Sequence, residues 1–377
     1  MTFIKFCRRF SAFLILSLLL AWPAVSAAAT RDGVEYVVKE GDALEKLALI
    51  YLGETEGVQK IVDATLAAGG GEFLGQEEFQ NPLPAGRKLI LPVRLTERDP
   101  AEYLLFDGLK FPEGVRYFPE EEALYFVEWE GDVIWKLKDG QKSLFAATQK
   151  GDGPNGVARD PSGDFWVVFY SSGKLARYDS SGRQTKIYEE GPAGRFVGPN
   201  DLVVDRDGGV FFTASGDFGD DWTTGREAGK VYRLSPEGEM ELVDENISYA
   251  NGIVISPDGR KLYVNEHRKN RILVYDLDGG AASNRRVFVQ LPENCLSAGE
   301  SCFETGPDGM NIDGQGNLWV AHYHSGAILK INPAGETIDR IYLPQGDTPT
   351  NVALSPDEKT LFVTESSQGL LLKIPVE

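Results

Sequence analysis

Six copies of a short phrase recur between residues 111 and 351, and this repeat restricts the folds available to the chain. Each copy has a polar residue, which we call the anchor, followed by a small residue, an apolar segment, a turn and a second apolar segment. Repeats of 42 to 57 residues are typical of β-propeller blades, which surround a central channel. The repeat therefore predicts a mainly β, six-bladed propeller at 103–377. Its anchors are Glu113, Asn155, Asn200, Asn251, Asp308 and Asn351.

The last repeat has room for only three strands, at 352–354, 360–363 and 370–374. An apolar segment at 103–106 precedes the first anchor and belongs to no repeat. We expect it to supply the missing outer strand, since joining the two ends of the propeller removes an exposed sheet edge.

Each anchor begins the innermost strand of its blade, so the anchors should meet at one mouth of the channel. The second strands return to the same face, and their ends should line the rim of a pocket there. These ends contain Glu128, Trp129, Phe169, Tyr170, Asp217, Glu266, His267, His322, His324 and Glu365. Among them, His322 and His324 are candidate substrate contacts, together with Asn155 and Asn200. Arg226, in a long insertion at 216–229, is a further candidate, with an ordinary surface loop as the alternative.

Four anchors, Glu113, Asn200, Asn251 and Asp308, offer two carboxylates and two amide oxygens. An all-oxygen set favours a hard cation, Ca²⁺ first, with Mg²⁺, Mn²⁺ or Zn²⁺ as alternatives. Because Ca²⁺ takes roughly six to eight oxygens, four protein ligands would leave positions for water and substrate. The alternative is that these side chains only cap the innermost strands.

The chain is acidic, with a formal net charge of -19 and no basic cluster. Such a surface repels phosphate backbones and anionic lipids. Nucleic acid is therefore not an expected partner.

The first 29 residues have the pattern of a secretory signal peptide, with Lys5, Arg8 and Arg9 before an apolar run and small residues at 25–27. This predicts export to the periplasm or the extracellular space, by either the general or the twin-arginine route. No later segment is apolar enough to span a membrane. In an oxidising compartment, Cys295 and Cys302 are expected to form a disulfide, with metal binding or redox chemistry as the alternative.

Residues 30–95 predict a separate βααβ unit, joined to the propeller by a charged linker at 96–102. The unit resembles the LysM family on residues Tyr36, Gly41, Asp42, Leu44, Tyr51, Leu83, Gly86, Leu89, Leu91 and Pro92. The resemblance implies binding of glycans such as peptidoglycan, with Gly41, Asp42 and Leu44 at the groove. A purely structural module is the alternative.

Four segments carry a second resemblance: PEGVRY, GPNDLVVDRDGGVFFT, ANGIVISPDGRKLYV and GPDGMNIDGQGNLWVA. They resemble the senescence marker protein/gluconolactonase family, which includes regucalcin-like proteins and consists of six-bladed, calcium-dependent propellers. The resemblance implies metal ligation by Glu113, Asn251 and Asp308. It makes Asn200 either a fourth ligand or a substrate contact, and it makes Asp308 the base or nucleophile.

The expected function is that of an exported, divalent-metal-dependent hydrolase, a lactonase acting on a small lactone or ester. In this hypothesis the metal polarises the carbonyl group, and Asp308 activates water or attacks directly. One alternative is a non-catalytic propeller that binds glycan or protein at the cell wall. Another is an enzyme that resembles strictosidine synthase or an arylesterase.

Overall fold

The computed structural model describes residues 34–37, 44, 47, 57–67, 88–91, 102–217, 227–291, 305–343 and 345–376. These residues fall into two compact units, one ending at Leu91 and the other beginning at Glu102. Several predictions concern residues outside the described ranges: the leader at 1–29, Gly41, Asp42, Arg226, Cys295, Cys302 and most of the linker. Within the described residues, no helix is both long and apolar enough to cross a membrane.

The N-terminal unit contains a small antiparallel sheet and a helix. Strand β1 (Val34–Val37) pairs with β2 (Lys88–Leu91), so that Tyr36 lies opposite Leu89. Helix α3 (Gly57–Ala67) buries Ile61 and Val62, and Leu89 of β2 is also buried. Leu44 and Leu47 are helical and buried. These elements lie where the sequence predicts them, and the assignment to the LysM family stays a prediction.

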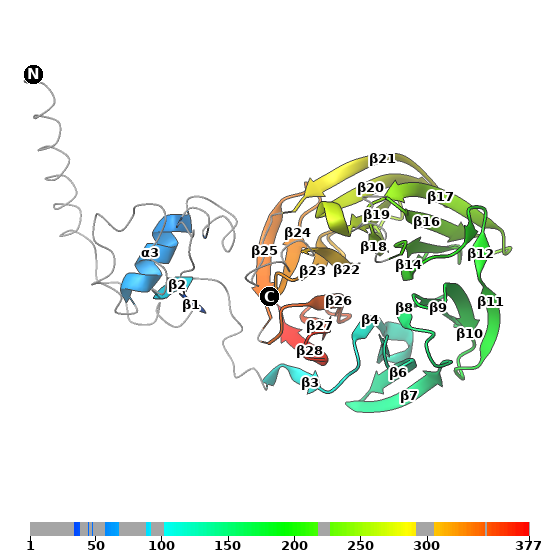
Figure 1. Cartoon of the computed structure of the whole chain (residues 1–377), viewed down its shortest axis with the longest axis horizontal. Helices are drawn as coiled ribbons and strands as arrows, with labels where there is room; N and C mark the ends of the chain where they lie inside the picture. The colour runs from blue at the N-terminus through cyan, green and yellow to red at the C-terminus, as the bar shows by residue number, and fades with distance from the viewer. Residues whose placement is uncertain are drawn as a thin grey trace, which may run out of the picture. The chain divides into compact units, whose positions relative to one another are not determined.

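The second unit is a ring of six antiparallel sheets (Figure 1). The prediction of a mainly β, six-bladed propeller is thus confirmed. Blades 1 to 3 are β4 (Pro112–Phe118), β5 (Ala123–Glu128), β6 (Val133–Lys138) and β7 (Gln141–Ala147); β8 (Pro154–Arg159), β9 (Phe165–Phe169), β10 (Lys174–Tyr178) and β11 (Gln184–Tyr188); and β14 (Pro199–Val204), β15 (Val210–Ala214), β16 (Gly229–Leu234) and β17 (Met240–Ile247). A short ribbon, β12 (Glu190–Gly191) and β13 (Gly194–Arg195), connects blades 2 and 3.

The remaining blades follow the same order from the innermost strand outward. They are β18 (Ala250–Ile255), β19 (Lys261–Glu266), β20 (Arg271–Asp278) and β21 (Ala281–Gln290); β22 (Gly306–Ile312), β23 (Leu318–Tyr323), β24 (Ala327–Ile331) and β25 (Thr337–Tyr342); and β26 (Pro349–Leu354), β27 (Thr360–Glu365), β28 (Leu370–Pro375) and β3 (Leu104–Phe106).

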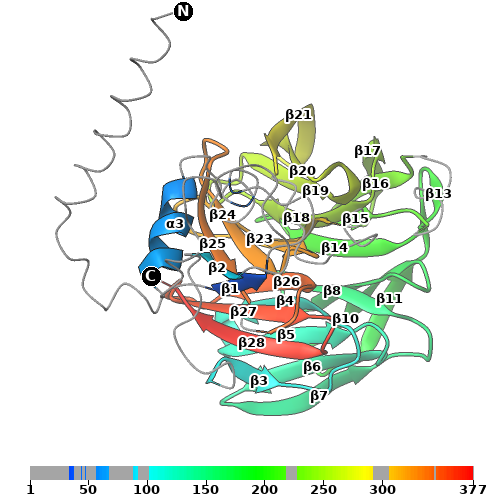
Figure 2. The same ribbon diagram turned by 60° about the vertical axis from the view of Figure 1, so that its left-hand side comes forward.

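Blade 6 combines both ends of the propeller segment. Strand β3 pairs antiparallel with β28, placing Phe106 opposite Leu371 and Leu104 opposite Leu372. Figure 2 shows the two strands side by side. Every blade therefore has four strands, and the ring closes through backbone hydrogen bonds rather than through a loop.

The second strand of a blade is buried on both faces because a neighbouring blade covers each of them. Every residue of β5, β9 and β15 is buried. The outer strand β11, by contrast, is largely exposed. The apolar core therefore lies between blades and fixes the strands next to the central axis.

Neighbouring inner strands approach each other closely just after the anchors. A Cβ atom added to Gly252 would lie 2.4 Å from the carbonyl oxygen of Asp308, and one added to Gly309 would lie 2.2 Å from Cγ of Asn351. The register of each inner strand also shifts near its anchor, for example between Ala250 and Ile253. Such irregularities change the direction of a side chain. Glycine and the register shift together allow the anchors to converge.

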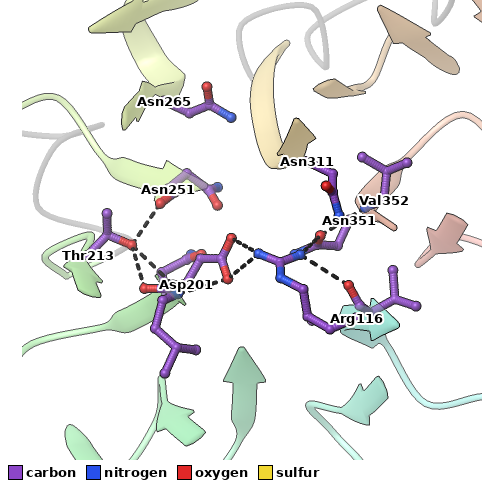
Figure 3. A network of polar contacts seen from close by, with 12 residues as sticks. Arg116, Asp201, Thr213, Asn251, Asn265, Asn311, Asn351 and Val352 are labelled. Carbon is purple, nitrogen blue, oxygen red and sulfur yellow. Dashed lines mark hydrogen bonds and ion pairs between the residues drawn. The ribbon is translucent and has the colours of Figure 1, made fainter. Parts of the chain in front are cut away.

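A buried ion pair and a hydrogen bond, both made by one arginine near the axis, join three blades (Figure 3). Arg116 Nη2 of β4 donates to Asp201 Oδ1 and Oδ2 of β14 at 3.0 and 2.9 Å. Arg116 Nη1 donates to Asn351 Oδ1 of β26 at 2.7 Å. The side chains of Arg116 and Asp201 are only 13% and 2% exposed. The pair therefore holds the inner strands of blades 1, 3 and 6 in register.

We expect Arg116→Met to destabilise the propeller by about 3–5 kcal/mol, because it leaves the Asp201 carboxylate buried without its counter-charge. The free energy of unfolding, measured in urea, checks this. The double variant Arg116→Met/Asp201→Asn removes both charges and should recover most of the loss. A double variant as unstable as the single one would contradict the electrostatic explanation.

A second prediction concerns the close approach at Gly252. Gly252→Ala places a methyl group against the Asp308 backbone and should cost about 1–3 kcal/mol, as overpacking does. Gly314→Ala is the matched control, because its Cβ would meet only the exposed side chain of Glu358, at 3.1 Å. Equal unfolding midpoints for the two variants would show that the inner strands can separate freely.

Candidate functional site

A pocket of about 440 Å³ opens where the inner strands begin and the second strands end. Its volume lies within the roughly 300–1,000 Å³ typical of small-molecule sites. The lining combines a group of polar anchors with a group of rings and one cation, Arg268.

The polar floor of the pocket consists of five of the six anchors. Asn155 and all four predicted metal ligands line it: Glu113, Asn200, Asn251 and Asp308. Each of these residues is at most 6% exposed. The sixth anchor, Asn351, does not line the pocket and accepts a hydrogen bond from Arg116. Residues separated by up to 195 positions in the sequence are thus brought together at one pocket.

Hydrogen bonds fix the orientation of the floor. Asn251 forms a side-chain hydrogen bond with the Asp308 carboxylate, and Asn265 Nδ2 donates to the Asp308 carbonyl oxygen at 2.5 Å. Asn155 Nδ2 donates to the Asn200 carbonyl oxygen at 3.0 Å. The backbone N–H of Gly114 donates to Glu113 Oε2 at 3.3 Å. The side chains are therefore held in place before any ligand binds.

The floor is electrostatically unbalanced. Burial raises the pKa of Glu113 well above its usual value, and the negative charges of Asp308 and Asp201 raise it further. Burial also raises the pKa of Asp308, and the charge of Asp201 acts in the same direction. A cation bound between the two carboxyl groups would favour their ionised forms.

The donor atoms fit a hard cation. Asn251 Oδ1 is buried and has no hydrogen-bond partner within the described structure, so it is available as a ligand beside the two carboxylates. The described residues contain no cluster of three or more His, Cys, Asp or Glu side chains suited to a metal. A site here would therefore combine two carboxylates with amide oxygens, the all-oxygen chemistry that Ca²⁺ prefers.

Six rings form a continuous wall, which we call the aromatic collar: Phe111, Trp129, Tyr170, Tyr249, His267 and Tyr323. The ring centroids of Phe111 and Trp129 are 5.1 Å apart, and those of Trp129 and Tyr170 are 6.1 Å apart. The hydroxyl groups of Tyr170 and Tyr249 are 2.9 Å apart. The ring centroid of His267 lies 5.6 Å from that of Tyr249 and 5.9 Å from that of Tyr323.

Sequence reasoning placed Trp129, Tyr170 and His267 on the rim but missed Phe111, Tyr249, Arg268 and Tyr323. Phe111 and Tyr249 share a recognisable position, since each lies two residues before an anchor. That offset could have identified them.

The structure does not place His322 or His324 among the residues that line the pocket. His322 is fully buried, with Nε2 2.8 Å from Asn270 Oδ1. Burial lowers its pKa to about 3, so its ring is neutral near pH 7. His324 contacts the ring of Tyr323, with centroids 4.5 Å apart. The histidine of the pocket is His267.

Three carboxylates expected at the rim instead hold backbone groups. Glu128, Glu266 and Glu365 accept hydrogen bonds from the N–H groups of Lys110, Ser248 and Thr348, at 3.0, 2.9 and 3.2 Å. His322 occupies the same ladder position in blade 5. This position faces the interior of the fold. In blades 1, 4 and 5 the next residue along the chain lines the pocket: Trp129, His267 and Tyr323.

Comparisons with known proteins agree with this geometry. Residues 111–367 match the family model described as SMP-30/Gluconolactonase/LRE-like region. A gluconolactonase from Zymomonas mobilis subsp. mobilis is 32% identical over 66% of this chain and 72% of its own length.

Two solved structures share the fold. A gluconolactonase from Xanthomonas campestris has a TM-score of 0.60 at 24% identity, covering 73% of this chain and 89% of that one. The calcium-binding protein regucalcin from Agrobacterium tumefaciens has a TM-score of 0.60 at 21% identity, covering 73% and 93%. On the extent of the family match and of the Zymomonas alignment, the chain belongs to the SMP-30/gluconolactonase/LRE-like family.

Proposed function

We propose that this chain is a divalent-metal-dependent lactonase whose active site is the pocket described above. The observation that carries the proposal is the convergence of Glu113, Asn251 and Asp308 on its floor. The similarity to a gluconolactonase at 32% identity supports lactones as the substrate class.

In this proposal Glu113, Asn251 and Asp308 hold the cation, and Asn200 is either a fourth ligand or a substrate contact. Ca²⁺ is the first candidate because all the donor atoms are oxygens. The resemblance to a calcium-binding regucalcin supports this choice. When bound, the cation would act as a Lewis acid toward the lactone carbonyl group.

Asp308 is the proposed base or nucleophile. Asn251 orients its carboxylate, and Asn265 fixes its backbone. As a base, Asp308 takes a proton from water while the water oxygen bonds to the carbonyl carbon. The ring C–O bond then breaks, and the leaving alkoxide is protonated. As a nucleophile, Asp308 itself bonds to that carbon, the ring C–O bond breaks, and the leaving alkoxide takes a proton; water then hydrolyses the resulting acyl-enzyme and regenerates the Asp308 carboxylate.

Asp308→Asn should lower kcat for lactone hydrolysis by about 10²–10⁴-fold, the usual contribution of a positioned acid–base group. A chelator should abolish turnover, and added Ca²⁺ should restore it. Asp207→Asn, a change in an exposed turn, is the control and should leave kcat unchanged. Hydrolysis that survives both the chelator and Asp308→Asn would contradict the proposal.

The same assays address the alternatives. Stoichiometric metal binding without turnover of any lactone would favour a non-catalytic binding propeller. Turnover of aryl esters or of amine–aldehyde pairs, with lactones left intact, would favour an arylesterase-like or strictosidine-synthase-like enzyme. A single turnover in ¹⁸O-labelled water that places the label in the Asp308 carboxyl group would identify Asp308 as the nucleophile, because a carboxylate that acts only as a base keeps both of its own oxygens.

We also propose that the protein is exported and that its N-terminal unit is a LysM-like module that binds peptidoglycan. The basic and apolar pattern of residues 1–29 supports the first part, and the fingerprint around Gly41, Asp42 and Leu44 supports the second.

The mature chain should therefore cosediment with purified cell-wall sacculi and be displaced by soluble N-acetylglucosamine oligomers. Asp42→Ala should weaken this retention without changing lactone turnover. A chain that stays in the supernatant would disprove the binding role of the module. Recovery of the protein in the cytoplasmic fraction would disprove export.

A further inference from the structure

The aromatic collar follows a rule at the junctions between blades. The inner and second strands of every blade share an equivalent residue pair, such as Pro112 with Glu128 in blade 1 and Pro307 with His322 in blade 5. Two positions meet at each junction: the residue after the second-strand member of this pair in one blade and the residue before its inner-strand member in the next. At three junctions the second position is glycine, and an added Cβ would come into tight contact with the ring opposite. The Cβ would lie 2.5 Å from Trp129 Nε1 at Gly153, 3.0 Å from Tyr170 Cε2 at Gly198, and 3.1 Å from His267 Cγ at Gly306.

The other three junctions also pair one ring with one small residue, but the small residue is serine or threonine rather than glycine. Blade 3 ends its second strand with Ser215, and blade 4 presents Tyr249; Ser215 Oγ donates to the carbonyl oxygen of the adjacent Ala250 at 2.7 Å. At the junction of blades 6 and 1, Ser366 faces Phe111. At the junction of blades 5 and 6, Tyr323 faces Thr348. Each of the six junctions thus supplies one ring, and together these rings form the collar.

Two of the rings occupy a backbone conformation that disfavours them. Gly153 and Gly198 have φ values of 61°. Phe111 and Tyr249, at the equivalent positions, have φ values of 52° and 62°. Bulky residues rarely adopt this left-handed conformation, and such outliers concentrate at functional sites. The two strained residues, Phe111 and Tyr249, lie opposite Ser366 and Ser215. A glycine in place of Phe111 or Tyr249 would relieve the strain but would leave that junction without a ring.

Four rings of the collar use polar atoms in hydrogen bonds within the protein: Trp129, Tyr170, Tyr249 and His267. Trp129 Nε1 donates to Ser171 Oγ at 3.1 Å, and His267 Nδ1 lies 3.2 Å from the Pro307 carbonyl oxygen. The Tyr170 and Tyr249 hydroxyl groups are hydrogen-bonded to each other. What the collar offers a ligand is therefore mainly ring faces and edges. The polar anchors and Arg268 can meet only the hydroxyl groups that face them, and the hydroxyl groups of a polyhydroxylated substrate that face the collar would be buried without matching partners, which is unfavourable.

We propose that the substrate is a lactone with an apolar, preferably aryl, body, rather than a polyhydroxylated sugar lactone. The ester group reacts at the polar floor, and the flat body is held by the collar, where aromatic contacts are favourable. This inference rests on the proposed lactonase function and specifies its substrate class.

The test compares three six-membered lactones: dihydrocoumarin, which carries an aryl body, unsubstituted δ-valerolactone, and glucono-δ-lactone. The kcat/KM for dihydrocoumarin should exceed that for glucono-δ-lactone by roughly tenfold or more. Trp129→Ala should lower kcat/KM for dihydrocoumarin by about tenfold while changing that for δ-valerolactone less than about twofold. Trp129→Phe should restore most of the loss.

Two further variants separate recognition from folding. Phe111→Gly removes a ring and relieves its strained φ, so the same selective loss should occur without a fall in the unfolding temperature. Tyr188→Ala, on the outer strand β11, should leave both values of kcat/KM unchanged. Equal losses for dihydrocoumarin and δ-valerolactone would overturn the assignment of the collar to substrate recognition.

The two proposals fail in different ways. Metal-dependent turnover that favours glucono-δ-lactone over dihydrocoumarin would overturn the inference and leave the lactonase function standing. No turnover of any of the three lactones in the presence of Ca²⁺ would overturn both.

Discussion

The close contact of the inner strands around the axis is the constraint on which the structure depends. The backbones of β18 and β22 approach so closely at Gly252 that no side chain fits between them. Because the inner strands are packed together there, five of the six anchors line a single pocket. The ion pair between Arg116 and Asp201 adds an electrostatic bridge across the same axis. A rigid floor follows from this packing, and Asp308 acquires its environment from blades far from it in the sequence.

The sequence predicted the architecture well because the repeat is a property of the whole chain. The anchor spacing indicated six blades, and the apolar runs located the inner and second strands. The same reasoning placed Glu113, Asn200, Asn251 and Asp308 at one mouth, and the structure brings all four to one pocket.

Other side chains could not be placed from strand direction alone. His322 and His267 both lie near the end of a second strand, but one is buried in a junction and the other faces the pocket. The difference is a single residue of register, which periodicity does not resolve. Tyr249 was missed because it precedes its strand in a left-handed conformation that sequence patterns assign to glycine. The residues of the pocket wall are thus set by local register and backbone conformation, whereas the residues of the floor are set by the repeat.

The pairing of β3 with β28 has a consequence for how this chain could acquire additional parts. The first and last strands of the propeller are hydrogen-bonded neighbours, and β3 is the outermost strand of its sheet. Any segment fused ahead of β3 therefore joins at a peripheral strand, and the innermost strands need no rebuilding. The two ends of the propeller segment are also close together, because the backbone N–H of Lys373 donates to the Tyr103 carbonyl oxygen at 2.7 Å. The architecture separates the strand at which a new module would attach from the inner strands that form the pocket.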